Sequence, residues 1–551
     1  MSAAVTLHPV HPMTQPGLLK RIGLLRLCAV LLALMVMAPL LVIALSWGTV
    51  QTDIWAHLAQ TQLARLLGNT LVLVLGVGSS VLVLGVALAW LTATCQFPGR
   101  KLFDVALMLP LAVPAYVMAF VMVGLLDWAG PVQSQLREWF GRGVSFSFRG
   151  TGAVIMVLAL VLYPYVYMLA RNAFLAQGRE PLEAARVLGH SPLRGFFLVA
   201  LPMARPAIAA GVALALMETL ADFGAVSVFN YDTFTTAIYK AWYGFFNVQA
   251  AAQLASLLLV IVLAGLFLER KARGDARYYQ SARRKAQLHR TRLTGTQGWL
   301  ATAFCGLIFL LAFGIPIIQL LVWVGQGAWQ DLDERYAALV LHTLGLGFGA
   351  ALLTVAAAFL LAYFKRRYAD AFAATLVRLA SLGYALPGSV LAVGIMISFN
   401  HLDDWAAQAQ TALGIPVQPV FVGGVLALLL AYVTRFLAAA FGPVETSLER
   451  IKPSIPEAAA ILGARQWEIV RRIYLPMLAP GLLTAGLLVF VDVMKEMPAT
   501  LLMRPFGWDT LAVRIHEMTS EGLWQHAALP GLTLVLVGLL PVAILVRRSG
   551  R

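Results

Sequence analysis

The chain has 551 residues, of which 60% are hydrophobic and only 12% charged. Soluble proteins are on average about half apolar and about a quarter charged, so this composition excludes an ordinary soluble fold, and it is equally unlike a disordered, collagen-like or coiled-coil chain. The mean hydropathy of +0.80 points to a lipid environment. Cys28, Cys95 and Cys305 are isolated from one another, which argues against a disulfide framework or a zinc site.

Twelve segments are apolar and long enough to cross a bilayer, for which a helix needs about 20 residues. The first follows a polar N-terminal tail and is longer than the apolar core of a signal peptide, so we expect it to remain as an uncleaved span. The sequence therefore predicts an all-α integral membrane protein. The twelve predicted spans are 23–47, 68–93, 102–126, 151–170, 206–228, 248–268, 300–325, 342–364, 379–399, 420–440, 478–500 and 527–546.

The net charge of +15 would suggest a nucleic-acid partner in a soluble protein. If the N-terminus is cytoplasmic, however, all but nine of the 41 Lys and Arg residues fall in cytoplasmic segments. This distribution follows the positive-inside rule, which explains the charge without nucleic acid and predicts that both termini are cytoplasmic. The nine on the opposite side are Arg65, Arg137, Arg142, Arg149, Lys240, Arg335, Lys495, Arg504 and Arg514.

Short strings that recur 273 residues apart divide the chain into two related halves. Residues 69–71 (Asn-Thr-Leu) recur as 342–344 (His-Thr-Leu), and 114–117 (Pro-Ala-Tyr-Val) recur as 387–390 (Pro-Gly-Ser-Val). Each half holds six spans, an even number, so the two copies should have the same orientation, with a substrate path between them. The predicted organisation is a cytoplasmic N-terminal tail (1–22), a first six-span half (23–268), a basic cytoplasmic linker (269–298) and a second six-span half (299–551).

The joint between the halves is strongly basic. Residues 269–297 contain nine Lys and Arg but only two acids, Glu269 and Asp275. We interpret this stretch as a solvated cytoplasmic linker that follows the charge rule, in preference to a surface for anionic lipids or for regulation.

A longer string recurs in one cytoplasmic loop of each half, displaced by 274 residues. Residues 183–189 read Glu-Ala-Ala-Arg-Val-Leu-Gly and residues 457–463 read Glu-Ala-Ala-Ala-Ile-Leu-Gly. The pattern predicts a short helix that the glycine ends, followed by a second short helix that the downstream Pro202 or Pro476 stops. Ser454 stands three residues before Glu457, which predicts a capping box at the start of the second copy.

In these loops the sequence resembles the permeases of ABC importers, whose EAA loop is a hallmark. In that family the loop forms coupling helices that dock into clefts of the ATPase subunits, so the resemblance implies that two loops bind two ATPase subunits. The alternative is that the loops are amphipathic connectors lying on the lipid interface, and the duplication of the string argues against it. No lysine here follows a glycine, so a Walker A loop is missing, and ATP and magnesium are expected in a separate ATPase. The resemblance assigns ATPase coupling to Glu183, Ala184, Ala185, Gly189, Glu457, Ala458, Ala459 and Gly463.

Two predicted spans carry carboxylates near their middle. Glu218 and Asp222 in the first half recur as Asp492 and Glu496 in the second, each pair spaced to share one helix face. A carboxylate in the bilayer is costly, so it normally faces a wet cavity or a partner. One interpretation is a transient path for a hard cation, which prefers oxygen ligands. The other is that the spans end earlier and the acids form ordinary outer salt bridges, with Lys495 pairing with Glu496.

The strings on the predicted outer side, 231–243 and 503–514, resemble those of the fused permeases of ferric iron importers, as do 218–226 and 495–502 before them. That family is a twelve-helix unit of the bacterial inner membrane. It receives ferric iron from a periplasmic binding protein.

Other candidate ligands have simpler explanations. Three outer tyrosines and a tyrosine triplet in the fourth span suit an aromatic belt at the membrane interface better than iron binding. Two outer histidines suit the surface, no stable metal site is predicted, and three prolines should kink their helices. These residues are, in that order, Tyr231, Tyr239 and Tyr243; Tyr163, Tyr165 and Tyr167; His516 and His526; Pro110, Pro114 and Pro387.

We therefore predict the non-catalytic permease subunit of an ATP-driven importer that moves ferric iron by alternating access between its two halves. A permease of the same class for thiamine, a phosphonate or another small solute is the nearest alternative. An ion-coupled secondary transporter, in which the intramembrane acids would be proton or sodium sites, is a second one. A membrane enzyme would need a nucleophile or metal cluster, and the sequence offers none.

Overall fold

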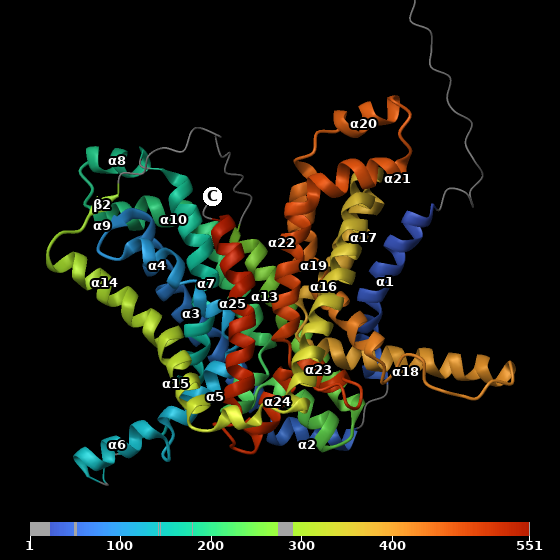
Figure 1. The fold of residues 1–551 in the computed structure, drawn as a ribbon, viewed down its shortest axis with the longest axis horizontal. Helices are drawn as coiled ribbons and strands as arrows, with labels where there is room; N and C mark the ends of the chain where they lie inside the picture. The colour runs from blue at the N-terminus through green and yellow to red at the C-terminus, as the bar shows by residue number, and fades with distance from the viewer. Residues whose placement is uncertain are drawn as a thin grey trace, which may run out of the picture.

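The computed structural model describes residues 23–48, 52–141, 143, 145–178, 180–273 and 290–549. Within these residues the fold is helical apart from two strands of two residues each (Figure 1). Long apolar segments form helices because a helix satisfies all its backbone hydrogen bonds internally, which lipid cannot do for it.

The first half comprises α1 (Leu24–Leu45), η2 (Ser46–Gly48), α2 (Thr52–Thr61), α3 (Leu63–Thr94), β1 (Cys95–Gln96), α4 (Arg100–Ala106), η3 (Leu109–Ala112), α5 (Ala115–Leu126), α6 (Pro131–Phe140), α7 (Thr151–Gln177), α8 (Glu180–Val187), α9 (Pro192–Gly195), η4 (Phe196–Ala200), α10 (Leu201–Ala221), α11 (Gly224–Val228), α12 (Phe234–Tyr239), η5 (Lys240–Gly244) and α13 (Val248–Arg273). The remainder comprises β2 (Thr291–Arg292), α14 (Thr296–Phe309), η6 (Leu310–Gly314), α15 (Ile315–Gly325), η7 (Ala328–Asp331), α16 (Glu334–Tyr368), α17 (Ala371–Ala380), η8 (Ser381–Ala385), α18 (Gly388–Ala412), α19 (Val425–Glu449), α20 (Ser454–Ile461), α21 (Gln466–Ile469), η9 (Val470–Tyr474), α22 (Leu475–Met494), α23 (Pro498–Met503), α24 (Leu511–Ser520) and α25 (Ala528–Ser549).

In the described part of the chain, ten helical segments are long and apolar enough to cross a membrane. The pair α17 and α18, bent by 110°, makes an eleventh if it is counted as one broken span, and Ala528–Ile544 within α25 is a shorter apolar helix. The predicted segments thus correspond to helices, and the predicted span 379–399 is bent where a continuous helix was expected.

Two predicted spans, 102–126 and 379–399, are broken at the same point of the repeat. Pro114 precedes α5 and Pro387 precedes α18, and the residue before each proline, Val113 or Leu386, is extended. Proline disfavours the helical conformation at the preceding residue, and here that residue is extended in both halves. The expected kinks at these two prolines are therefore full breaks between separate helices.

The first span of each half packs on the other half (Figure 1). Helix α1 contacts α16, α17 and α18, whereas α14 contacts α4 and α15 contacts α5. Accordingly, Ala33 and Val36 of α1 belong to the apolar core of the second half, and Leu320 and Trp323 of α15 belong to that of the first. The exchange joins the two sequence repeats into one body.

The described end of the linker is attached to the first half. β2 pairs in parallel with β1, the Leu293 N–H donates to the Gln96 carbonyl at 3.0 Å, and Arg290 Nε donates to the Ala93 carbonyl at 3.2 Å. Residues 274–289 of the predicted basic linker lie outside the described residues.

The two ends of the molecule differ (Figure 1). Helices α8 and α20 lie at one end, together with the start of α1 and the end of α25. Helices α2, α6 and α24 lie at the opposite end. The paired EAA loops are therefore on the same side as both termini of the helical body.

Candidate functional site

The two EAA strings form matching elbows, which we define as residues 180–195 and 454–469. Helix α8 carries Glu183, Ala184 and Ala185, and α20 carries Glu457, Ala458 and Ala459. Each helix stops at the predicted glycine: φ is +83° at Gly189 and +88° at Gly463. Residues with a Cβ rarely adopt this left-handed backbone conformation, so a glycine at this position is what allows the turn.

The same hydrogen bond closes both elbows. The His190 N–H donates to the Ala185 carbonyl, and the Ala464 N–H donates to the Ala459 carbonyl, each at 3.0 Å. This is the bond that satisfies the last carbonyls of a helix ending in a left-handed residue. The two elbows are thus the same structure at positions 274 residues apart.

Each elbow presents apolar side chains to its surroundings. Val187 and Leu188 are 88% and 76% exposed, and their counterparts Ile461 and Leu462 are both 87% exposed. Leu193 and its counterpart Trp467 are also exposed and begin the second arm of each elbow. Exposed apolar residues grouped at a protruding helix end mark an interaction site.

Two details of the elbows differ from expectation. Ser454 lies inside α20 and makes no capping hydrogen bond at its start, so the predicted capping box is absent there. Pro202 and Pro476 do not stop a helix: each lies in the first turn of α10 or α22, directly after a π-helical turn, η4 or η9. Proline is tolerated where the missing N–H is not needed, and the wider π turn precedes that point in both halves.

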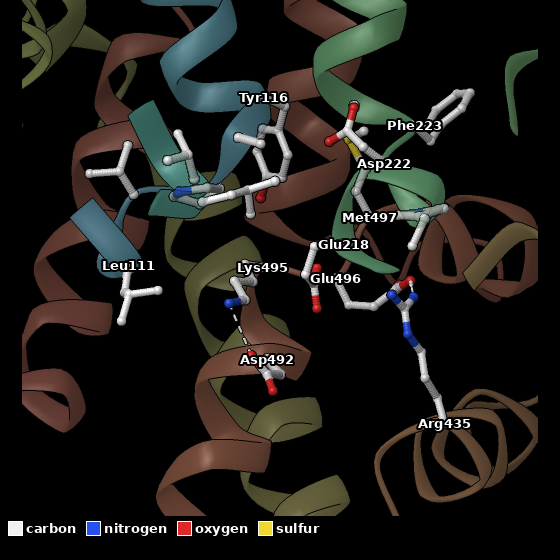
Figure 2. Close-up of a pocket in the computed structure, with 18 of the residues that line it drawn as sticks. Leu111, Tyr116, Glu218, Asp222, Phe223, Arg435, Asp492, Lys495, Glu496 and Met497 are labelled. Carbon is white, nitrogen blue, oxygen red and sulfur yellow. Dashed lines mark hydrogen bonds and ion pairs between the residues drawn. The ribbon is translucent and has the colours of Figure 1, made fainter. Parts of the chain in front are cut away.

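A cavity of about 110 Å³ lies between the halves (Figure 2). Its walls come from the first half at α7, α10 and the start of α5, and from the second half at α19 and α22. Its charged lining consists of four acids and two bases: Glu218, Asp222, Asp492, Glu496, Arg435 and Lys495.

The later acid of each pair caps a short helix. Helix α10 ends at Ala221 and α22 at Met494, so the helices end earlier than the predicted 228 and 500. Asp222 Oδ1 accepts a hydrogen bond from the Val226 N–H at 3.0 Å, and Glu496 Oε2 accepts one from the Thr500 N–H at 2.9 Å. Carboxylates are favoured at helix N-termini, which explains why the span breaks directly after these residues.

The acids also differ in their ionic partners. Lys495 Nζ lies 3.0 Å from Asp492 Oδ1, so Lys495 pairs with Asp492 and the suggested pairing with Glu496 is wrong. Glu496 is instead paired with Arg435 of α19, and the Glu496 side chain is only 1% exposed. Sequence reasoning missed Arg435, although an arginine inside an apolar span is itself a signal of a buried carboxylate partner.

The tyrosine triplet of the fourth span is not an aromatic belt. Tyr163 and Tyr167 are completely buried in the core around α7, and the Tyr163 hydroxyl donates to the Leu107 carbonyl at 3.0 Å. Tyr165 lines the cavity. Helix α7 is surrounded by other helices rather than by lipid, which the tyrosine spacing could not reveal.

The outer tyrosines and histidines have different surroundings: Tyr239 and His516 are partly buried between helices, whereas Tyr243 and His526 are exposed. The Tyr239 ring packs at a tilt against Tyr243, with ring centroids 5.1 Å apart, and also contacts His516 of α24. The Tyr243 hydroxyl approaches the Leu501 carbonyl at 3.4 Å, whereas His526 pairs with Asp331 at 2.8 Å. Among the described residues, no group of three or more His, Cys, Asp and Glu side chains is arranged to hold a metal ion.

The model of a family described as binding-protein-dependent transport system inner membrane component matches residues 81–270 and again residues 354–551, so that each match contains one elbow. The chain belongs to this family. It is the permease component of a binding-protein-dependent ABC importer and a multi-pass protein of the inner membrane. The permease is not itself catalytic, and ATP hydrolysis belongs to the ATPase partner.

Individual relatives extend the comparison. The permease is 30% identical to the Fe(3+)-transport system permease protein FbpB 2 of Haemophilus influenzae, over 89% of this chain and 90% of that protein. It is 32% identical to the molybdenum transport system permease protein ModB of Escherichia coli, over 33% of this chain and 78% of that protein. A crystal structure of a bacterial alginate ABC transporter matches with a TM-score of 0.37 and 16% identity, over 46% of this chain and 94% of that one.

Proposed function

We propose that this permease imports ferric iron, which a periplasmic binding protein delivers and which passes between the two halves into the cytoplasm. The observation that carries the proposal is the 30% identity with an Fe(3+)-transport permease along nearly the whole of both chains. A cargo-specific path in this class involves both halves, and the similarity extends over both.

We further propose that Glu218, Asp222, Asp492 and Glu496 line the path. They share the walls of the cavity between the halves with two bases, which leaves the lining with a formal excess of acids. Fe³⁺ is a hard cation for which carboxylate oxygens are suitable ligands, and an acidic cavity with low-dielectric walls concentrates cations.

The two elbows are proposed to bind two ATPase subunits, one each. Their exposed apolar tips, Val187 with Leu188 and Ile461 with Leu462, suit insertion into a cleft of a partner. Closure of the ATPase pair on ATP would then move both elbows together, and the halves would rock about the cavity.

This assignment also orients the permease. The end that carries the elbows faces the cytoplasm, together with both termini, and the end that carries α2, α6 and α24 faces the binding protein. The proposed units remain the tail 1–22, the halves 23–268 and 299–551, and the linker 269–298.

The cargo is tested with the permease and its ATPase reconstituted in lipid discs. Iron-loaded binding protein is expected to stimulate ATP hydrolysis, and iron-free binding protein is not. Stimulation by a binding protein loaded with thiamine or a phosphonate, but not with iron, would reassign the cargo. Solute uptake that survives ATP depletion but collapses with the ion gradient would replace the importer with a secondary transporter.

The path is tested with the double variant Glu218→Ala/Asp492→Ala. Iron uptake into proteoliposomes is expected to fall at least about tenfold, because one cavity-lining acid of each half is lost. The control is Glu138→Ala/Asp404→Ala, which removes two exposed acids outside the cavity. Normal uptake by the first variant at normal expression would contradict the proposed path.

A further inference from the structure

We propose that Lys495 acts as a built-in counter-ion in the path. Its ion pair with Asp492 leaves Glu218 as the one carboxylate open to the cargo, so that a highly charged cation is released from the cavity and not retained there. This inference rests on the proposed function and assigns to Lys495 a role in release.

Three of the four cavity acids already have partners. Asp222 accepts the Val226 N–H at 3.0 Å, and Asp492 lies 3.0 Å from Lys495 Nζ. Glu496 accepts the Ala499 N–H at 3.0 Å besides its ion pair with Arg435. These contacts neutralise or satisfy the three carboxylates, so each is a weaker ligand for an entering cation.

Glu218 differs from them. Among the described residues it has no direct hydrogen-bond or ion-pair partner of the kind the other three acids have; the Lys495 ammonium acts on it as the strongest nearby positive charge, and the side chain lines the cavity. Figure 2 shows the Glu218 carboxylate between Lys495 and Glu496, in the middle of the charged lining. It is therefore the acid in this group that a cation could reach without displacing a protein partner.

The position of Lys495 is specific to the second half. The residue 274 positions earlier is Ala221, so the first half has no lysine beside its own acid. Lys495 directly follows the last residue of α22, where the helix dipole favours a positive charge. The Lys495 and Asp492 side chains are 27% and 22% exposed, which leaves the pair accessible from the cavity.

The consequence concerns release rather than entry. A path conducts only if each site binds an ion strongly enough to admit it and weakly enough to let it go. Two unpaired carboxylates, one on α10 and one on α22, would attract a trivalent cation much more strongly than one does, because the effective dielectric between protein walls is lower than that of bulk water. Lys495 removes one of the two, as a built-in competitor of the cargo.

The decisive variant is Lys495→Met, which keeps the length of the side chain and removes its charge. In the complete complex with ATPase and iron-loaded binding protein, we expect the radioactive iron retained on the washed complex to rise about tenfold. Uptake into proteoliposomes should fall by a similar factor. Lys495→Arg retains the charge and should rescue both quantities to within about threefold of the wild type.

A second variant separates charge balance from structure. Lys495→Met/Asp492→Asn removes the pair as a unit and again leaves Glu218 as the open acid, so it should lower iron retention and recover uptake relative to Lys495→Met. Thermal unfolding of each purified complex shows whether the helices remain folded.

Three results would overturn the inference. They are unchanged retention and uptake in Lys495→Met, impairment of Lys495→Arg equal to that of Lys495→Met, and a double variant that is no better than Lys495→Met. Any of these results, obtained while the wild type imports iron, leaves the proposed function intact. A wild-type complex that imports another solute but no iron would overturn both.

Discussion

The two halves of the permease are alike where they bend and different where they carry charge. Both elbows have the same closing hydrogen bond and the same left-handed glycine, and both halves have a broken span, at Pro114 and at Pro387. The cavity does not repeat: its two bases, Arg435 and Lys495, both come from the second half. The backbone of the elbows and of the broken spans is thus repeated, which suits the two equivalent ATPase subunits proposed above, whereas the proposed path has one neutralised side and one open side.

The elbows offer the strongest test of the symmetric part. Gly189→Pro and Gly463→Pro should each abolish most binding-protein-stimulated ATP hydrolysis, with losses of about tenfold or more, because proline cannot adopt a positive φ. The two losses should be equal within about twofold if the elbows are equivalent. ATPase activity and co-purification of the ATPase subunit measure the effect.

The matched control is Gly414→Pro. Gly414 has φ +69°, lies in the turn that follows α18, and a Cβ added there would meet nothing within 4 Å. The substitution Gly414→Pro imposes a comparable backbone strain outside the two elbows, so attachment of the ATPase subunit should persist. A loss of attachment in this control, or full coupling in either elbow variant, would contradict the equivalence of the elbows.

The charged part predicts unequal stability effects at equivalent acids. Arg435→Met leaves the Glu496 carboxylate buried without its ionic partner and should destabilise the permease by about 3–5 kcal/mol. Asp222→Asn, at the equivalent acid of the first half, weakens only a helix cap and should cost about 1 kcal/mol. Thermal unfolding of the purified permease in detergent measures both.

Glu496→Gln combined with Arg435→Met serves as the control, because it removes the buried pair as a unit. This double variant should be more stable than Arg435→Met alone. Equal destabilisation by Arg435→Met and Asp222→Asn would show that the halves bear charge in the same way.

The repeated features were predictable from the sequence because they depend on local chemistry. Gly189 and Gly463 end their helices as predicted, since only glycine adopts the required φ at little cost. The pairs of acids also reach a common cavity, since a buried carboxylate needs a polar surrounding and parallel repeats meet at the centre. Composition and helix length were enough to establish the fold class.

The rest depends on contacts between distant segments. The exchange of α1 and α14 between the halves leaves no local signal, because a lipid-facing and a helix-facing apolar residue look alike in sequence. For the same reason the sequence does not separate the buried Tyr163 and Tyr167 from residues of a membrane-interface belt, and it leaves Glu496 as an open alternative partner of Lys495, which pairs with Asp492. All three side chains line the cavity, and pairing is decided by the break after α22, which leaves Lys495 beside Asp492 and Glu496 beside Arg435.

The exchanged first spans should also respond unequally to small substitutions. A Cβ on Gly394 of α18 would lie 2.7 Å from the Pro39 carbonyl oxygen of α1, a backbone atom that cannot move aside. A Cβ on Gly124 of α5 would meet the edge of the Trp323 ring of α15 at 2.6 Å, and a side chain can tilt. We expect Gly394→Ala to cost about 2–3 kcal/mol and Gly124→Ala about 1 kcal/mol.

Thermal unfolding in detergent checks this pair, with Gly48→Ala as the control because a Cβ there meets nothing within 4 Å. A larger cost at Gly124 than at Gly394 would mean that α15 is held more rigidly than α1, and would reverse the comparison.

The smallest difference is expected at the outer ion pairs. Arg65 on α3 pairs with Asp232, but its side chain is 59% exposed, so Arg65→Met should cost about 0.5 kcal/mol. In the second half, Arg504 pairs with both Asp509 and Glu517 and is 23% exposed, so Arg504→Met should cost about 1 kcal/mol or slightly more. Raising the salt from about 0.1 M to 1 M should erase most of the Arg65 effect and less of the Arg504 effect, because exposed charges are screened more completely. Equal unfolding temperatures for the two variants at low salt would show that the outer loops, unlike the cavity, bear their charge symmetrically.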